Sequence, residues 1–482
     1  MGISSAIQKN NAWDEYKYLV NGLAFLDTAH PIDLDVTPLS MVNALFVRGL
    51  SWSFERFDQD LFWARLPTLF MSAIALLTTF WWTRRHEGRL PAIGALILYL
   101  FSPNIMAHAR LVSPDSILAS LSLLLVCVIW IYTMRPSWYN VGIVGLVLGM
   151  TLLAKFSGII WIPLSVLLVA MLNARASVRL VLSMFVAAIV LWIGYGMNFL
   201  PHYPFAPDLT TYWEGLQDVR HELSQGFPSF IAGERGQGWW YYYILLILIK
   251  TTIPLLVLSG VGIFLGIRYA KTRNLVALLS IPAFASVCCA SLTNMSLGIR
   301  HILLVYPLLV MLGGIGIFHL LKANLWGKWL VAILLLWHIG ASVFIYPHYL
   351  AYFNETVGGP NNGWRWAVDS NLDWGQDLKG LARYVNEHNI PSIYLAYFGQ
   401  GFPQCYPAPF KYLPSAASTV KSSIPLKFVD PERLHGWVAI SATQLQGVWN
   451  EVFGLPPDLY AQFKSVAPVT KIGYSIFIYH LP

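Results

Sequence analysis

The feature that most constrains this chain is a series of long apolar stretches. Apolar residues make up 56% of its 482 positions, and charged residues make up only 11%. A helix needs about 20 apolar residues to cross a hydrocarbon core that is roughly 30 Å thick. The pattern predicts an all-α polytopic membrane bundle of about ten helices, which begin near Leu61, Pro91, Asp115, Asn140, Gly158, Arg179, Tyr241, Asn274, His301 and Trp329.

Basic residues mark alternate connections between these stretches, from Arg84 and Arg85 to Lys322 and Lys328. Lys and Arg are retained on the cytoplasmic side during membrane insertion. We therefore expect a multi-pass protein of the bacterial inner (plasma) membrane, with its other connections outside the cytoplasm. The net charge of +7 then reflects topology and gives no reason to expect nucleic-acid binding.

Three parts follow from this topology. They are an extracytoplasmic first loop with interfacial helices (1–60), the transmembrane bundle (61–346) and a C-terminal extracytoplasmic α/β domain (347–482). In the last part, Leu378, Leu381 and Val385 recur at helical spacing. Three apolar runs there are typical of strands, namely 392–398, 436–441 and 472–479.

Loop 200–238 interrupts the bundle and ends at Trp239 and Trp240, aromatic residues that suit a membrane interface. We expect this loop to form a lid over a site that substrates enter from the lipid. Residues 1–11 contain no signal-peptide core. Both chain ends can then lie outside only if a transmembrane helix precedes residue 1, or if the first helix translocates the N-terminus.

Three acidic residues on the predicted outer face are candidates for catalysis. Asp14 and Glu15 lie in the first loop, and Asp115 lies in a short connection between two apolar stretches. Carboxylates at the mouth of a helical bundle could take a proton from a hydroxyl group. Each also has a simpler explanation, as a solvated acid that suits the N-terminal end of a helix. Together the three could hold a hard divalent cation, but no tight group of His, Cys and acidic residues predicts a metal site.

Basic residues inside or beside the apolar stretches are the complementary signal. Lys250 lies in an otherwise apolar run, where a buried ammonium group needs an anionic partner or a water-filled cavity. Lys155, Arg300 and His301 lie at outer helix ends, where snorkelling to the interface is the alternative. Arg110 lies in an outer connection, and all five suit a lipid phosphate. No Walker loop and no G-x-G-x-x-G unit is present, which argues against a nucleotide-bound donor.

Motifs along nearly the whole chain carry a family resemblance. They are Trp13-Asp14-Glu15, Ala64-Arg65-Leu66-Pro67, Ser102-Pro103-Asn104, Lys155-Phe156-Ser157-Gly158, Gly238-Trp239-Trp240, Gly298-Ile299-Arg300-His301, Tyr352-Phe353-Asn354-Glu355 and, the most specific, Asp369-Ser370-Asn371-Leu372-Asp373-Trp374-Gly375-Gln376-Asp377-Leu378. In these motifs the chain resembles the dolichyl-phosphate-mannose-protein mannosyltransferase-like family, which comprises bacterial and archaeal glycosyltransferases of the GT-C fold.

The resemblance implies a sugar donor linked to a polyprenyl or dolichyl phosphate, and transfer with inversion to an extracytoplasmic hydroxyl of a protein, lipid or glycan. It implies that Asp14 is the general base, with Glu15 beside it, and that Asp115 orients the reacting groups. The predicted phosphate-binding residues are Lys250, Arg300, His301, Lys155 and Arg110. The predicted acceptor and lid residues are Trp239, Trp240, Asp373, Trp374 and Gln376.

Two other functions stay open on the residues alone. One is a transporter or lipid flippase, in which Lys250 would be the substrate-binding charge, although the sequence shows none of the inverted repeats that such proteins usually have. The other is a non-catalytic assembly subunit whose external part binds partners. We predict an integral-membrane glycosyltransferase, for which a divalent cation is the one cofactor considered.

Overall fold

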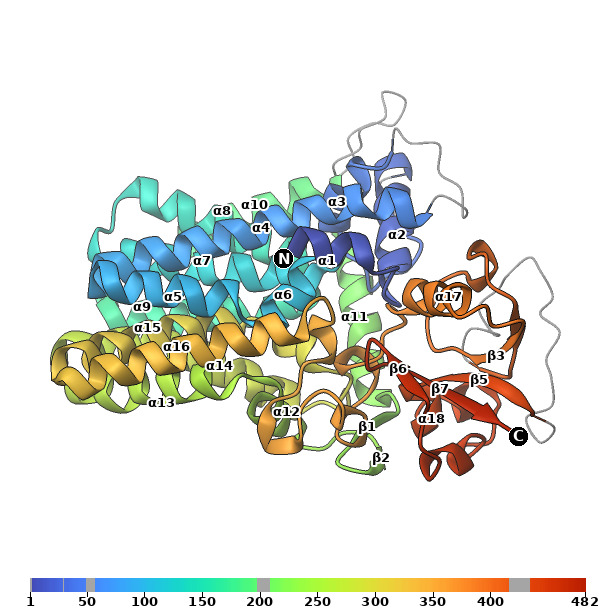
Figure 1. Ribbon diagram of the computed structural model, residues 1–482. Coiled ribbons are helices and arrows are strands. Elements are labelled where there is room, and N and C mark those ends of the chain that lie inside the picture. Colours follow the sequence, from blue (N-terminus) through green and yellow to red (C-terminus); the bar gives the residue numbers. More distant parts are fainter. Residues whose placement is uncertain (1, 29, 49–56, 197–208, 416–433) are drawn as a thin grey trace.

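The computed structural model describes residues 2–28, 30–48, 57–196, 209–415 and 434–482. Long helices lie side by side in a bundle, and a small sheet lies at one end of it (Figure 1). The bundle contains α4 (Phe57–Glu87), α5 (Arg89–Leu100), α6 (Pro103–Ala109), α7 (Pro114–Met134), α8 (Trp138–Ala154), α9 (Trp161–Asn173), α10 (Ser177–Gly196), α12 (Tyr242–Lys250), α13 (Ile253–Arg268), α14 (Ala270–Ser291), α15 (Val305–Ala323) and α16 (Leu325–Ile345). The predicted fold class, a helical membrane bundle with a C-terminal α/β part, is confirmed.

Within the described residues, six helical stretches are long and apolar enough to cross a membrane. Two bent pairs, α5 with α6 and α12 with α13, raise this number to eight. The number is lower than the predicted ten for two reasons. Helix α8 has 17 residues, which is at the short end of the range for a membrane span, and it is not among the six. The stretches predicted near Gly158 and Arg179 join in one run, Phe156–Tyr195, in which a turn at Ala174–Ala176 separates α9 from α10.

Helix starts follow capping chemistry. Helix α7 begins at Pro114, whose missing N–H group is not needed in a first turn, and the Ser113 hydroxyl accepts the Asp115 N–H at 3.2 Å. Helix α16 begins after Asn324, whose side chain accepts the Gly327 N–H at 2.9 Å. These short polar residues determine the position at which each apolar helix begins.

Two contacts explain how the bundle packs. The bent pair α12 and α13 turns by 113°, and lipid offers no partner for the carbonyl groups freed by such a break. The Asn354 amide supplies one, because it donates to the carbonyls of Leu248 at 2.6 Å and Thr251 at 2.9 Å. Helices α13 and α15 approach closely at Gly262, where a Cβ atom would lie 1.9 Å from the Leu312 carbonyl oxygen.

The basic connections lie together. Figure 1 shows the turns between α4 and α5, between α13 and α14 and between α15 and α16 at one end of the bundle. The helix ends that meet at these turns carry Arg84, Arg268, Lys271 and Lys322. The N-terminal helices and the sheet lie at the other end. This arrangement agrees with the alternating pattern in the sequence, while the side of the membrane on which each end lies stays a prediction.

Short elements precede and interrupt the bundle. The first loop forms α1 (Gly2–Gln8), α2 (Glu15–Thr28) and α3 (Met41–Leu45). The predicted lid forms α11 (Thr210–Gln225) and a hairpin of β1 (Ser229–Ile231) and β2 (Glu234–Gly236), while its residues 200–208 lie outside the described part of the chain. Helix α11 packs on the bundle, since the Tyr212 and Phe156 rings lie 5.3 Å apart.

The C-terminal part contains a five-stranded sheet of order β4-β3-β5-β7-β6. Its elements are α17 (Leu378–Glu387), β3 (Ile393–Ala396), β4 (Phe410–Tyr412), β5 (Gly436–Ser441), α18 (Ala442–Gln446), β6 (Thr470–Ile472) and β7 (Ile476–Leu481). Strands β4, β3 and β5 are parallel, and β7 runs antiparallel to β5 and β6. The predicted helix and the strands predicted at 392–398, 436–441 and 472–479 are confirmed as α17, β3, β5 and β7. Strands β4 and β6 were not predicted, because each has only three residues.

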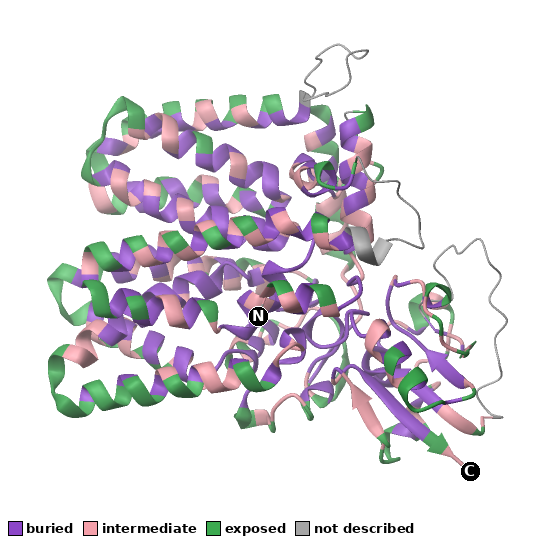
Figure 2. Ribbon diagram, turned by 45° about the horizontal axis from the view of Figure 1, so that its top comes forward, coloured by how far each residue is buried: buried purple, intermediate pink, exposed green. Residues whose placement is uncertain are grey.

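Burial separates the two ends of the bundle. Figure 2 shows buried residues concentrated where the bundle meets the C-terminal part, and exposed residues at the turns of the opposite end. Several large apolar side chains on the bundle surface are exposed, among them Phe70, Phe284 and Phe344. Exposed apolar side chains on long apolar helices are typical of contact with lipid.

The predicted topology can be tested by labelling single cysteines in a protein whose four native cysteines are replaced. We expect a membrane-impermeant thiol reagent to modify Glu387→Cys in intact cells and to spare Arg84→Cys and Arg268→Cys. All three positions are exposed, so permeabilised cells should label each of them. Labelling of position 84 or 268 in intact cells would reverse the topology.

Candidate active site

Two acids and two cations from distant segments meet beside the C-terminal part. Asp14 Oδ2 accepts a hydrogen bond from Arg300 Nη1 at 2.5 Å, and Asp115 Oδ1 accepts one from Lys155 Nζ at 2.6 Å. Arg300 Nη1 also lies 3.9 Å from Asp115 Oδ2. One guanidinium therefore lies between both carboxylates, and we call these four residues the Asp14–Asp115 cluster.

The first loop places Asp14. The Trp13 N–H donates to the Trp374 carbonyl at 2.9 Å, and the Trp13 ring stacks on the Phe398 ring at 4.7 Å between centroids. The Asp14 side chain is 19% exposed. Its Oδ1 has no hydrogen-bond partner among the described residues. Asp14 thus has one oxygen held by Arg300 and one oxygen available to a ligand.

Asp115 is held more completely. It lies in the first turn of α7, where the helix dipole favours a negative charge. The Ser113 hydroxyl donates to Oδ2 at 2.8 Å, Lys155 binds Oδ1, and the side chain is only 1% exposed. This geometry suits a group that orients its neighbours better than one that exchanges protons with a substrate.

Arg300 and His301 present unpaired nitrogen atoms. Burial lowers the pKa of Arg300, but Asp14 and Asp115 outweigh burial and leave that pKa above its usual value. Burial, together with Lys155 and Arg300, holds the pKa of His301 well below its usual value. Arg300 Nε and His301 Nε2 are buried, and neither has a hydrogen-bond partner among the described residues. His301 is therefore neutral, and it offers a hydrogen bond rather than the positive charge expected from the sequence.

Glu15, although next to Asp14, belongs to a different arrangement. Its carboxylate accepts hydrogen bonds from Arg65 Nε at 2.8 Å and Arg65 Nη2 at 2.6 Å. It also accepts the backbone N–H groups of Ala12 and Val112, both at 2.8 Å. Both side chains of the ion pair are 1% exposed. Glu15 thus holds the first loop in place, and its expected position in one site with Asp14 is not seen.

Lys250 is likewise engaged elsewhere. Its Nζ donates to the backbone carbonyls of Leu350 at 3.0 Å, Tyr352 at 3.1 Å and Asn371. It also lies 4.4 Å from the centroid of the Phe353 ring. An ammonium group has three N–H donors, so none is left for a phosphate in this conformation. Lys250 ties the end of α12 to the chain that follows α16.

Arg110 lies in a second group of charges. It is fully buried, and its charged neighbours are Arg65, Glu15 and Asp377 rather than members of the Asp14–Asp115 cluster. Burial lowers its pKa to about 10. No guanidinium nitrogen of Arg110 has a partner within the described parts of the chain. The structure therefore does not place Arg110 with Arg300, as the sequence suggested.

The two lid tryptophans differ in exposure. Trp239 stacks on Tyr242 with ring centroids 6.2 Å apart, whereas the Trp240 side chain is 70% exposed. Both lie just after the β1–β2 hairpin and before α12. Trp240 is thus available to a lipid interface, and Trp239 packs within the protein.

The three residues expected to shape the acceptor site lie in one buried loop. Trp374 touches the cluster, because its ring lies 4.4 Å below the Arg300 guanidinium. Gln376 accepts the Trp374 N–H at 2.8 Å and so fixes the loop. Burial raises the pKa of Asp373 to about 8, while the Thr443 N–H donates to Oδ2 at 2.8 Å. Of the three, Trp374 is the residue in contact with the candidate site.

The structure does not assemble the three acids into a ligand set. Across the described ranges, no three His, Cys, Asp or Glu side chains come close enough to hold a metal ion. Glu15 turns towards Arg65, so it does not join Asp14 and Asp115. The divalent-cation site considered from the sequence therefore lacks its third ligand.

Two further acids near the cluster were not singled out from the sequence. Burial raises the pKa of Glu222, on α11, to about 6, and Asp35 and Asp14 add to the shift. Burial also raises the pKa of Asp369 to about 6 against the influence of Arg300. Asp369 belongs to the most specific sequence motif, so the sequence could have indicated it. In the structure it also has an unusual φ of 57°. Glu222 lies in no motif, and only the fold brings it near Asp14.

The role of Glu15 can be tested through stability. Glu15→Gln should lower the free energy of unfolding by about 3–5 kcal/mol, because it leaves the buried Arg65 guanidinium without a counter-charge. Asp27→Asn is the matched control, since its ion pair with Arg48 at 2.9 Å is exposed and contributes about 0–1 kcal/mol. Unfolding in detergent measures both variants. Equal losses would contradict a structural role for Glu15.

Asp373 generates a pH prediction. Its pKa is about 8 in the folded protein and about 3.9 when unfolded. At a pH between these two pKa values, Asp373 is protonated in the folded protein and ionised in the unfolded chain. The free energy of unfolding therefore falls as pH rises, by at most about 1.4 kcal/mol per pH unit. Asp373→Asn cannot lose this proton and should show a flatter decline from about pH 5 to about pH 8. Parallel unfolding profiles for the two proteins would refute the assignment.

Comparison with known proteins agrees with the fold. Residues 50–196 match the family model described as dolichyl-phosphate-mannose-protein mannosyltransferase. A search of curated proteins by sequence finds no match.

Solved structures match nearly the whole chain. ArnT from Cupriavidus metallidurans bound to undecaprenyl phosphate is 14% identical with a TM-score of 0.54, and the match covers 99% of this chain and 95% of ArnT. The oligosaccharyltransferase of Archaeoglobus fulgidus, tethered to an acceptor peptide, is 13% identical with a TM-score of 0.50, and the match covers 93% of this chain and 68% of that protein. The chain therefore has the GT-C fold, and its residues 50–196 match the model of the family that its motifs resemble.

Proposed function

We propose that this protein is an integral-membrane glycosyltransferase that moves a sugar from a polyprenyl- or dolichyl-phosphate donor to an extracytoplasmic hydroxyl, with inversion. The observation that carries the proposal is the Asp14–Asp115 cluster, in which two carboxylates from distant segments share one guanidinium. The family match over residues 50–196 supports sugar transfer. The similarity to ArnT bound to undecaprenyl phosphate supports a lipid-linked donor.

Asp14 is the base in this proposal. The acceptor oxygen attacks the anomeric carbon while the bond between that carbon and the phosphate oxygen breaks. The hydroxyl proton passes to Asp14 Oδ1, and the polyprenyl phosphate leaves with the bonding electrons. A hydroxyl group has a pKa far above 7, so a positioned carboxylate assists the attack. A single displacement of this kind inverts the anomeric centre.

Arg300, His301 and Lys155 hold the leaving phosphate in this proposal. Arg300 Nε and His301 Nε2 are buried and have no partner in the described chain, so both can face a phosphate oxygen. Lys155 gives one N–H to Asp115 and has others available. Fixed donors and positive charge favour the charge that develops on a leaving phosphate. Lys250 and Arg110 are left out, because Lys250 is saturated and Arg110 lies in the second group of charges.

The proposal is tested by Asp14→Asn, which keeps the size of the side chain and removes the proton acceptor. We expect turnover to fall by roughly 10²–10⁴, with nearly unchanged donor binding. Asp115→Asn should reduce turnover less, because Asp115 orients the reacting groups. The assay incubates the purified protein with a panel of polyprenyl-phosphate sugars and measures released polyprenyl phosphate and the anomeric configuration of the product.

Asp27→Asn serves as the control in this assay, since Asp27 lies on α2 and its side chain is exposed. Its turnover should equal that of the unmodified protein. Transfer by the Asp14→Asn protein at the unmodified rate would rule out Asp14 as the base. Movement of the lipid donor across a bilayer without cleavage of the sugar–phosphate bond would favour a flippase instead.

A further inference from the structure

Two adjoining cavities lie outside the Asp14–Asp115 cluster and share Tyr474. The apolar groove, of about 470 Å³, lies between α16 and the loop at residues 352–360. The polar pocket, of about 460 Å³, lies between His348 and the turn that joins β6 to β7. No residue lining either cavity bonds to Asp14 or Asp115 in the described chain. The two cavities are therefore separate from the candidate active site.

One face of α16 forms the floor of the apolar groove. Leu336, Trp337, Gly340, Ala341, Phe344 and Ile345 line it. From the first to the last of these residues the helix rises by roughly 14 Å, which is about the thickness of the hydrocarbon layer of one leaflet. The Phe344 side chain is 88% exposed. Glu355, on the facing loop, also lines the groove, and its carboxylate accepts a hydrogen bond from Trp337 Nε1 at 3.0 Å. The apolar residues of α16 form a strip that is long enough for one lipid chain.

The polar pocket is basic. Lys471 and His348 line it, and no acidic residue does. Lys471 Nζ donates one N–H to the Asn361 carbonyl at 2.8 Å and lies 4.7 Å from the centroid of the Phe477 ring. Its other N–H groups have no hydrogen-bond acceptor among the described residues. The hydroxyl group of Thr470 adds a polar lining. This combination favours an anion with several acceptor oxygens.

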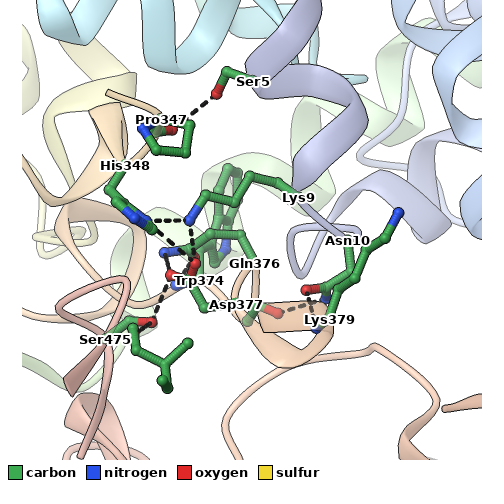
Figure 3. Close-up of polar contacts among 12 residues, drawn as sticks. Ser5, Lys9, Asn10, Pro347, His348, Trp374, Gln376, Asp377, Lys379 and Ser475 are labelled. Carbon is green, nitrogen blue, oxygen red and sulfur yellow. Dashed lines mark hydrogen bonds and ion pairs between the residues drawn. The ribbon is translucent and has the colours of Figure 1, made fainter. Parts of the chain in front are cut away.

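A buried ion pair beside the pocket determines which ring nitrogen of His348 can donate a hydrogen bond to an anion. Figure 3 shows Lys9 between His348 and Asp377, and Ser475 bound to the same carboxylate. Lys9 Nζ lies 2.5 Å from His348 Nδ1, and an ammonium group can only donate, so Nδ1 accepts a hydrogen bond and the ring N–H is at Nε2. Lys9 offsets the charge of Asp377. His348 thus keeps one N–H donor for a ligand in the pocket.

The turn between β6 and β7 is held in an unusual conformation where the cavities meet. Tyr474 has a φ of 67°, which is uncommon for a bulky side chain. Gly473 precedes it with a φ of 62°, and a Cβ atom there would lie 2.3 Å from the Asp377 carboxylate. Backbone strain of this kind persists where the surrounding structure fixes it, and it is common at binding sites. The turn places Tyr474 at the junction of the apolar and basic cavities.

We propose that the groove and the pocket together bind one anionic membrane phospholipid, with an acyl chain along α16 and its phosphate against Lys471 and His348. A soluble sugar or a free ion would leave the apolar groove empty. A lipid fills both cavities, because the pocket begins where α16 ends at Ile345, at the predicted boundary of the hydrocarbon layer. The site goes beyond sugar transfer and does not depend on that proposal.

The test measures lipid binding to the full chain in detergent. Native mass spectrometry counts the phosphatidylglycerol or phosphatidylcholine that each protein retains. We expect phosphatidylglycerol to bind more tightly, because the Lys471 ammonium group favours a net negative headgroup. Lys471→Met should weaken its binding about tenfold, as expected for the loss of a charge-assisted hydrogen bond. Phe344→Ser should also weaken it, by shortening the apolar contact with the chain.

Matched controls lie outside both cavities. Lys411→Met removes an exposed lysine of β4, and Phe284→Ser removes a 70% exposed phenylalanine of α14. Neither should change phosphatidylglycerol binding. Tyr474→Gly removes the side chain that both cavities share and leaves the backbone of the turn unstrained, since glycine adopts a positive φ readily. This variant should bind the lipid less well. Thermal unfolding without lipid verifies that each variant is folded.

Three outcomes would overturn the site. The first is equal binding by the Lys471→Met and Lys411→Met proteins. The second is equal binding of phosphatidylglycerol and phosphatidylcholine by the unmodified protein. The third is displacement of the lipid by an equal concentration of glycerol phosphate, which would show that the pocket takes a free phosphate and that the groove does not contribute.

Discussion

The end of the molecule that carries the N-terminal helices depends on one buried guanidinium, that of Arg65. It donates to both oxygens of Glu15 and to three backbone carbonyls of the first ten residues, at 2.6–3.3 Å. A buried charge is costly unless it is paired and its donors are satisfied. The N-terminal segment meets this requirement by wrapping around a side chain of α4. The direction of Asp14 follows, because it is adjacent to the residue that Arg65 holds.

Adjacent acids thereby take different positions. Glu15 faces Arg65 inside the protein, and Asp14 faces Arg300 at the edge of a partly exposed site. The cations divide in the same way, since Lys155 meets Asp115 while Lys250 binds only backbone carbonyls among the described residues. A charge with every donor or acceptor satisfied stabilises the scaffold, and a charge with one atom unpaired can meet a ligand. By this criterion Asp14 and Arg300 stay in the candidate site, and Arg110, whose guanidinium nitrogens have no partner among the described residues, marks a second position with unpaired charge.

Local patterns predicted much of the fold, whereas the partners of charges were not predictable. Apolar length indicated α7 and α16, and periodicity indicated α17, β3, β5 and β7, because these signals lie within each element. The break between α12 and α13 was not foreseen, since the carbonyls it frees are satisfied by Asn354, more than a hundred positions later. Motifs indicated Asp14 and Arg300 without showing that they pair. Their contact spans 286 positions, so only the folded chain could show it.

The candidate site depends on contacts between the first and last parts of the chain, so it can form only after the last part has been synthesised. The Ser5 hydroxyl donates to the Pro347 carbonyl at 2.8 Å, and Lys9 pairs with Asp377, partners separated by 342 and 368 positions. Translation delivers the membrane helices to the bilayer before these partners emerge from the ribosome. A chain with all its described helices inserted still has a first loop without the contacts that orient Asp14. During biogenesis, the helices of the enzyme therefore enter the membrane before the contacts that complete the candidate active site can form.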